Sequence, residues 1–188
     1  MTCNRQTILN MNTITIKDKK FKKFISAEEI DAIVGRVAKE IDRDYADLDL
    51  VACPVLTGAF MFASDLVRHI TIPCEVRFVR YASYSGMSST GEVKCQLPFP
   101  SAIEGRDVLI VEDVVDSGFS MKYMLQAAEA MHPRSVRICS LFFKPHAFKG
   151  DYKVNYVGKE IGDEFIVGYG LDYNEHGRTL KDLWVVAD

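Results

Sequence analysis

The sequence has few cysteines, and they are poorly placed for metal or disulfide chemistry. Its 188 residues include five of them, an odd number, spaced far apart and without a C-x-x-C pair: Cys3, Cys53, Cys74, Cys95 and Cys139. A zinc site and a disulfide framework are therefore not expected. We expect most of these thiols to act as small apolar side chains in a reducing compartment.

The sequence also lacks long hydrophobic runs and an excess of positive charge. No apolar run approaches the roughly 20 residues that span a bilayer, and the N-terminus has no apolar core of a signal peptide. The formal net charge of -3 gives no electrostatic case for a nucleic acid or a membrane surface as partner. The one dense basic run, Lys17–Lys23, is predicted to be a solvated arm. Together these absences predict a cytoplasmic protein with no nucleic-acid and no membrane partner.

What the sequence does contain is an alternation of helical and strand-like patterns. Its length and its 48% hydrophobic content suit one domain, residues 1–188. Ser26-Ala27-Glu28-Glu29 has the spacing of a capping box, so a helix is predicted to begin there. Two more helices are predicted over 60–70 and 121–131, and strands over 50–56, 75–80, 108–111, 136–143, 154–157 and 165–167. This order predicts an α/β fold, with a mainly parallel twisted sheet, helices on both faces and a small appended lobe.

One stretch, VLIVEDVVDSGFS (residues 108–120), joins an apolar strand to three carboxylates and a loop of small residues. Bare carboxylates beside a core are costly unless something binds them. In open parallel sheets, ligands lie beyond the carboxyl ends of the strands, and the amides at a helix N-terminus bind anions. A sugar phosphate suits both parts of the stretch: its diol would donate to Glu112 and Asp113, and its phosphate would bind in the following loop. The alternative is a plain turn whose acids are favoured by the helix dipole.

The same stretch resembles the 5-phosphoribosyl 1-pyrophosphate motif of the type I phosphoribosyltransferases. VLTGAFMFASDL, VRYASYSGMSSTGEV, VGYGLDYNEHGR and the lysine in LFFKPH are similar, in this order, to segments of the hypoxanthine-guanine phosphoribosyltransferase family. The resemblance implies the type I phosphoribosyltransferase fold, with a core over about 45–145 and a purine-binding hood formed by the N-terminal segment and 146–188. It also implies a flexible lid loop and a homodimer or homotetramer.

The activity implied by this resemblance is a reaction of purine salvage. Enzymes of the family transfer 5-phosphoribose from 5-phosphoribosyl 1-pyrophosphate to N9 of hypoxanthine, guanine or both. The products are IMP or GMP and pyrophosphate, and the cofactor is Mg²⁺.

The resemblance also assigns roles to the residues of the opening stretch. Glu112 and Asp113 hold the ribose hydroxyls, directly or through magnesium. Asp116 faces N7 of the purine as general acid and base. The 5′-phosphate lies in the loop formed by Asp116, Ser117, Gly118, Phe119 and Ser120, whose backbone amides carry the site, so that the Phe119 side chain is expected to point away.

Further roles fall on residues outside that stretch. Lys144 donates to the purine O6, Phe165 stacks on the base, and Ile166 contacts its edge through the backbone. Asp172 is a magnesium ligand near the base and the pyrophosphate. Pyrophosphate itself binds to Arg178 and to the loop of Thr57 and Gly58, where a non-proline cis peptide is usual and where some members carry a basic residue in place of Thr57. Ser83 and Tyr84 belong to the lid. Without the resemblance, Lys144 and Arg178 would be interpreted as surface charges and Phe165 as core.

Two alternatives of a different class remain at this stage. A regulator that binds a sugar phosphate and acts through nucleic acid would keep the fold, but the net acidity and the absence of a basic face disfavour it. A nucleotide-binding protein of another fold is disfavoured because Gly168-Tyr169-Gly170 is only part of a dinucleotide fingerprint. The sequence contains no P-loop motif.

Overall fold

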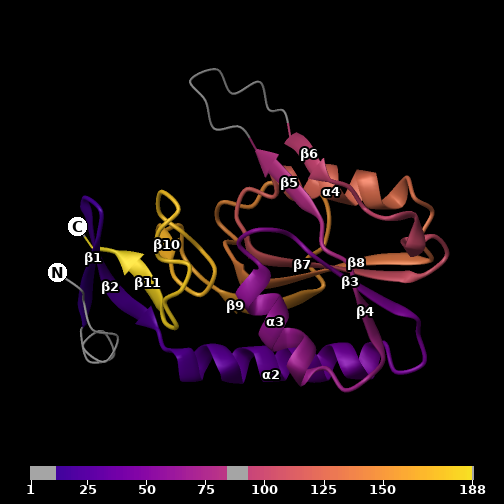
Figure 1. Cartoon of the computed structure of the whole chain (residues 1–188), viewed down its shortest axis with the longest axis horizontal. Coiled ribbons are helices and arrows are strands. Elements are labelled where there is room, and N and C mark those ends of the chain that lie inside the picture. The colour runs from indigo at the N-terminus through magenta and orange to yellow at the C-terminus, as the bar shows by residue number, and fades with distance from the viewer. Residues whose placement is uncertain (1–11, 84–92, 188) are drawn as a thin grey trace.

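A five-stranded parallel sheet forms the centre of the molecule (Figure 1). The computed structural model describes residues 12–83 and 93–187. The strand order across the sheet is β4 (Cys74–Val76), β3 (Leu50–Pro54), β7 (Asp107–Val115), β8 (Ser135–Phe143) and β9 (Tyr156–Glu160). Every neighbouring pair in this sheet is parallel.

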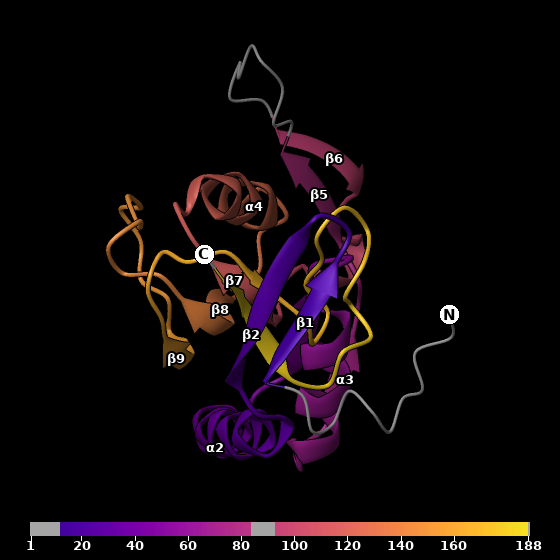
Figure 2. The ribbon, with the colours of Figure 1, turned by 90° about the vertical axis from the view of Figure 1, so that its left-hand side faces the viewer.

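Helices cover both faces of this sheet, as the sequence predicts. Helices α2 (Ala27–Asp44) and α3 (Phe60–His69) lie on one face and α4 (Phe119–Glu129) on the other (Figures 1 and 2). The strands supply alternate residues to the two layers. In β7, Leu109 and Val111 pack into the cluster that contains α2 and α3, whereas Val108 and Ile110 pack into the cluster that contains α4. The predicted fold class is therefore confirmed.

Helix α2 begins where the capping box predicts. The Ser26 side chain accepts a hydrogen bond of 3.2 Å from the backbone N–H of Glu29. The apolar stripe of the helix is buried at Ile30, Val34, Val37 and Ile41. The capping box and the inward-facing apolar stripe thus both agree with the position of the helix. Helix α2 packs on the central sheet, although the resemblance placed the core only from about residue 45.

A second, antiparallel sheet lies at one end of the molecule and joins the two ends of the chain (Figure 1). Its order is β1 (Thr13–Ile16), β2 (Lys19–Ile25), β11 (Leu183–Val186) and β10 (Ile166–Val167). The prediction of a solvated arm over Lys17–Lys23 is wrong. Phe21 and Ile25 lie four residues apart in β2 and are buried, whereas Lys19, Lys20 and Lys22 are exposed, so the strand is held by its apolar residues. We call this sheet the hood.

Several boundaries also differ from the sequence prediction: β9 covers 156–160 in place of 154–157, α4 covers 119–129 in place of 121–131, and two other strands differ more. The single strand predicted over 75–80 is two strands, because β4 ends at Val76 and the hairpin of β5 (Arg80–Ser83) and β6 (Val93–Leu97) begins at Arg80. The short link between them follows the continuation of β3, with the N–H of Val79 bonded to the Pro54 carbonyl at 3.0 Å. The strand predicted over 108–111 continues to Val115, because β8 pairs alongside it as far as Phe143.

Within the described parts of the chain, no helix combines the length and the apolar character needed to cross a membrane.

Asp182 joins the hood to helix α2, and its removal should loosen that junction. Its carboxylate accepts a 2.9 Å hydrogen bond from the N–H of Ala27 and lies 2.8 Å from Lys23 Nζ, and the residue is buried. We expect Asp182→Ala to lower the free energy of unfolding by about 1.5–3 kcal/mol, the usual range for a hydrogen bond to a charged group. Asp182→Asn keeps an acceptor and should lose less.

Chemical denaturation measures both variants, with Asp163→Ala at an exposed position as the control. If Asp182→Ala unfolds at the same denaturant concentration as this control, the junction contributes nothing and the expectation fails.

Candidate active site

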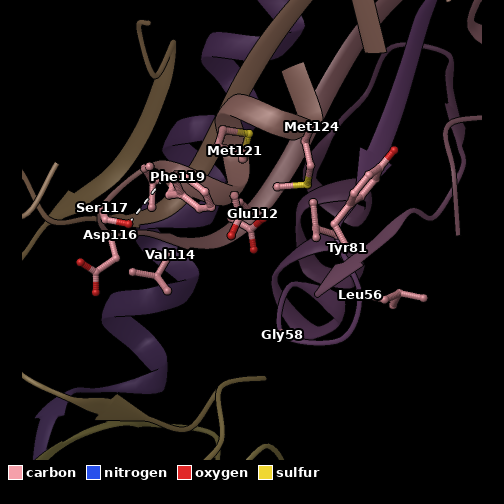
Figure 3. A pocket seen from close by; sticks show the side chains of 14 residues that line it. Leu56, Gly58, Tyr81, Glu112, Val114, Asp116, Ser117, Phe119, Met121 and Met124 are labelled. Carbon is pink, nitrogen blue, oxygen red and sulfur yellow. Dashed lines mark hydrogen bonds between the residues drawn. The ribbon is translucent and has the colours of Figure 1, made fainter. Parts of the chain in front are cut away.

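Two adjoining pockets open at the carboxyl edge of the parallel sheet. The loop pocket, of about 220 Å³, lies between β7 and the start of α4 (Figure 3). The hood pocket, of about 410 Å³, extends from the same edge to β10 of the hood. They share the residues of a common wall, namely Leu56, Gly58, Tyr81, Val114 and Asp116. The two pockets are therefore parts of one cleft.

The acidic pair of β7 is divided between the two pockets. Glu112 lines the loop pocket (Figure 3) and Asp113 the hood pocket. The regular alternation of β7 is interrupted here, since Val111 packs on the α2 side of the sheet and Val115 on the α4 side. Because the strand continues past the pair, the acids are held by a sheet ladder rather than by a free loop.

Both carboxyl groups of this pair are disfavoured as anions. Burial raises the pKa of Glu112 well above its ordinary value, and the charge of Asp113 raises it further. Burial also raises the pKa of Asp113, although a 2.7 Å hydrogen bond from the N–H of Val114 opposes this. A ligand that donates hydrogen bonds or brings positive charge would relieve the repulsion between the two.

Two glycines let three chain segments meet at Asp113. A Cβ atom at Gly58 would overlap the Asp113 carboxylate, and one at Gly170 would overlap the carbonyl oxygen of Gly58. The backbone of the 56–58 loop is thus enclosed between β7 and the hood. The peptide bond between Leu56 and Thr57 is cis, as the resemblance implies for this loop.

The loop between β7 and α4 is held by residues of the 149–152 segment, which donate hydrogen bonds to its carbonyl oxygens. The N–H of Lys149 donates to the Ser117 carbonyl at 3.1 Å, and the Tyr152 hydroxyl donates to the Gly118 carbonyl at 2.7 Å. Gly118 has φ = 79° and precedes α4, and a Cβ there would overlap the side chains of Phe148 and Tyr152. With these carbonyls turned outward, the first N–H groups of α4 are left for an anion.

Three side chains between β7 and the first turn of α4 differ in their surroundings. Ser117 accepts a weak hydrogen bond of 3.5 Å from the N–H of Phe119 (Figure 3), and Ser120 lines the loop pocket. The Phe119 ring is 43% exposed and lies edge-on to Tyr123, with 5.1 Å between the ring centroids.

Lys144 and Asp116 form an ion pair on the wall of the hood pocket. Lys144 Nζ lies 2.9 Å from Asp116 Oδ2, and the lysine is only 7% exposed. The two residues follow the neighbouring strands β8 and β7, and the N–H of Lys144 donates to the Val115 carbonyl at 3.0 Å. The pair therefore presents a donor and an acceptor side by side.

The hood supplies an aromatic wall and a free strand edge. The Phe165 ring is 46% exposed in the hood pocket and contacts Tyr173 and Phe21, with centroids 5.8 Å and 6.4 Å away. β10 is an edge strand. Because the Phe165 carbonyl accepts from the N–H of Val186, the alternation of an antiparallel ladder turns the N–H and C=O of Ile166 away from β11.

Asp172 and Arg178 close the hood pocket with a second ion pair. Arg178 Nη2 lies 2.8 Å from Asp172 Oδ1 and 3.0 Å from Glu175 Oε2, and its Nη1 donates to the Gly170 carbonyl at 3.0 Å. Asp172 also accepts a 2.8 Å hydrogen bond from the N–H of Glu175. The turn that carries both residues is thereby fixed.

Most of the residues assigned from the sequence meet in this cleft. The hood pocket is lined by Thr57, Gly58, Asp113, Asp116, Lys144, Phe165, Ile166, Asp172 and Arg178. The loop pocket is lined by Glu112 and by the loop of Asp116, Ser117, Gly118, Phe119 and Ser120. Ser83 is the last residue of β5, and Tyr84 lies outside the described residues, so the lid stays a prediction.

The sequence interpretation missed three residues of this site. Arg80 and Tyr81 line the cleft, and Tyr152 holds the loop between β7 and α4 through the Gly118 carbonyl. Arg80 ends and Tyr81 follows an alternating run, 75–80, whose pattern indicated only a half-buried strand, and the resemblance of VRYASYSGMSSTGEV assigned no role to either. No local pattern marks Tyr152, because its partner is 34 residues away in the chain.

In the described part of the chain, no group of three or more His, Cys, Asp or Glu side chains could hold a metal ion by itself. Asp113 and Asp172 nevertheless line the same pocket. Mg²⁺ commonly binds through one or two carboxylates together with substrate phosphates and water. The donor set fits a magnesium ion that arrives with a phosphorylated ligand.

Removal of one charge from the acidic pair should stabilise the fold. The unfolded chain ionises Glu112 at its ordinary pKa and the folded chain only above the raised one, so the native state loses stability as the pH rises between the two. We expect Glu112→Gln to raise Tm at pH 7 by roughly 2–4 °C, or about 1 kcal/mol for a chain of this size. The gain should disappear as the pH falls toward about 4.

Thermal unfolding at several pH values tests this, with Glu104→Gln at an exposed position as the control. A gain in Tm that is equal at both ends of the pH range would show that charge is not its cause.

Comparison with known proteins agrees with this geometry. A model of the phosphoribosyl transferase domain matches residues 26–174. The chain is 42% identical over 164 residues to the hypoxanthine-guanine phosphoribosyltransferase of Mycobacterium avium. The aligned region covers 84% of this chain and 81% of that protein. The chain is 39% identical over 166 residues to that of Bacillus subtilis, covering 88% of this chain and 92% of that protein.

A solved structure gives the same result. The crystal structure of a hypoxanthine-guanine phosphoribosyltransferase from Bacillus anthracis has a TM-score of 0.84 to this chain at 36% identity, over 92% of this chain and 100% of that one. The resemblance predicted from the sequence motifs is therefore confirmed. The chain belongs to the phosphoribosyltransferase family, among the hypoxanthine-guanine phosphoribosyltransferases.

Proposed function

We propose that this protein transfers 5-phosphoribose from 5-phosphoribosyl 1-pyrophosphate to N9 of hypoxanthine, guanine or both, giving IMP or GMP and pyrophosphate. The observation that carries the proposal is the meeting of two charge arrangements in one cleft. The acidic pair of β7 suits the diol of a sugar, and the ion pair of Lys144 and Asp116 suits the edge of an oxygenated purine.

The sugar phosphate is proposed to occupy the loop pocket. Its two ribose hydroxyls donate to Glu112 and Asp113, which relieves the repulsion between these carboxylates. Its 5′-phosphate accepts from the amides of residues 117–120, which lead into the first turn of α4 and carry no acidic side chain. The outward hydrogen bonds of the Ser117 and Gly118 carbonyls support this orientation.

The purine is proposed to bind in the hood pocket. Its plane stacks on Phe165, its edge contacts the N–H and C=O of Ile166, and Lys144 donates to O6. Adenine would present an amino donor to the Lys144 ammonium, so that two donors would face each other beside a buried cation whose one side-chain acceptor is Asp116. The arrangement therefore favours 6-oxopurines.

Asp116 is proposed to handle the proton of the base. As N9 forms its bond to C1′ and the C1′–oxygen bond to pyrophosphate breaks, a purine that carries its proton on N7 must release it. N7 neighbours O6 on the purine edge, and the Asp116 carboxylate lies beside Lys144, so it can accept this proton. Its half-exposed side chain can then pass the proton to water.

The leaving pyrophosphate is proposed to bind at Thr57, Gly58 and Arg178, with magnesium arriving as part of the donor. Asp113 and Asp172 are the carboxylates that would contact the metal. Bound magnesium would offset the negative charge that gathers on the departing pyrophosphate.

A panel of purines tests the proposed function. With 5-phosphoribosyl 1-pyrophosphate and magnesium, we expect pyrophosphate release with hypoxanthine, guanine or both, and a kcat/KM for adenine lower by roughly 10⁴-fold. Xanthine is included because it shares the 6-oxo group. Tight donor binding without turnover of any purine would favour a sugar-phosphate sensor instead, and a preference for adenine would overturn the assignment of the hood pocket.

Lys144 provides the second test. We expect Lys144→Ala to lower kcat/KM for the preferred 6-oxopurine by roughly 10- to 150-fold, the equivalent of one hydrogen bond to a charged group, and to leave the value for adenine nearly unchanged. Lys159→Ala, on the neighbouring strand β9 and paired with Glu29, is the matched control. A ratio of oxopurine to adenine turnover that stays at the parent value would remove Lys144 from base selection.

A further inference from the structure

The hood pocket contains one cation whose charge no carboxylate balances. Its six charged side chains are three acids, Asp113, Asp116 and Asp172, and three bases, Arg80, Lys144 and Arg178. Lys144 is paired with Asp116, and Arg178 with Asp172 and Glu175. Among the described residues, the Arg80 side chain has no ion pair and no hydrogen bond, although it lines the pocket and is exposed.

The position of Arg80 beside the 56–58 loop is set by backbone pairing. The N–H of Leu56 donates to the Val79 carbonyl at 2.8 Å, and Val55 and Val79 form a parallel bridge. Arg80 therefore follows directly the residue that holds this loop. On its other side, Arg80 is paired with Leu97 in the hairpin of β5 and β6.

The 56–58 loop needs a cation if it is to hold a polyanion. Thr57 is exposed and has no charge. The Asp113 carboxylate packs against Gly58 and adds negative charge next to the loop. Arg178, the other basic residue near the loop, already divides its guanidinium among Asp172, Glu175 and the Gly170 carbonyl. Backbone amides alone would have to offset the charge of pyrophosphate.

We propose that Arg80 is a second pyrophosphate-binding residue, supplying the cationic fork that Thr57 cannot. This inference rests on the function proposed above and deepens it. The guanidinium of arginine forms paired hydrogen bonds to phosphate oxygens, and its charge stays fixed at any working pH. Arg80 contacts the donor and the pyrophosphate product. It has no part in binding the 5′-phosphate, which lies in the loop pocket, or the purine, which contacts Lys144, Phe165 and Ile166 in the hood pocket.

Three variants test this proposal: Arg80→Gln, Arg80→Lys and the control Arg77→Gln. Arg77 is exposed on the same segment, but it is paired with Glu75 and does not line either pocket. Calorimetry of each protein with magnesium pyrophosphate and, separately, with the nucleoside monophosphate product measures the two subsites.

For Arg80→Gln we expect pyrophosphate affinity to fall roughly 10- to 100-fold, the range of a hydrogen bond to a charged group. The affinity for the monophosphate, which lacks pyrophosphate, should change less than about twofold, as should KM for the purine. Arg80→Lys keeps the charge without the fork and should recover part of the loss. Arg77→Gln should match the parent protein.

Two results would overturn the proposal. If Arg80→Gln binds pyrophosphate as the control does, Arg80 is a solvated surface charge. If the affinities for pyrophosphate and monophosphate fall together, Arg80 only supports the fold of the cleft. Both results presuppose a parent protein that turns over a 6-oxopurine, so failure of the purine panel is a separate outcome.

Discussion

The burial of two adjacent carboxylates at the end of the central strand is the constraint around which the cleft is organised. Glu112 and Asp113 extend β7 beyond its apolar half, and burial raises the pKa of both. No residue of the described chain neutralises Glu112 by an ion pair. A ligand with hydroxyl donors or bound magnesium would stabilise both acids at once, so the burial that destabilises the two anions also favours their interaction with such a ligand.

Close backbone contacts transmit this constraint to the rest of the cleft. Only glycine fits at positions 58 and 170, where the 56–58 loop is enclosed between Asp113 and the hood. On the other side, Lys149 and Tyr152 hold the carbonyl oxygens of the loop before α4, and the first N–H groups of the helix have no partner within it. In the proposed sites, the anions would therefore bind backbone groups, and those of the loop before α4 are held by residues that line neither pocket. Specificity for the base is assigned instead to side chains, chiefly the buried Lys144 beside Asp116.

The parts of the structure that the sequence predicts well are those that depend on neighbours in the chain. The capping box at Ser26 and the apolar stripe of α2 are local patterns, and both are confirmed. The alternation of strands and helices was sufficient for the fold class, and the stretch from Val108 to Ser120 for the position of the cleft. The predictions that failed concern pairing between distant segments. A run of lysines gave no sign that Phe21 and Ile25 would be buried in a hood strand, and the end of β7 depended on how far β8 runs beside it.

The sequence by itself determined the family, the elements of the parallel sheet and the residue types of the site, because short motifs carry the phosphate loop, the acidic pair and the hood turn. Only the tertiary structure decided which of these residues share a pocket. It placed Asp113 against Gly58, paired Lys144 with Asp116, and left Arg80 as the unpaired cation beside Leu56. The physical reason is that charge balance and close packing depend on distances between atoms far apart in the chain, and no local pattern of residues encodes these distances.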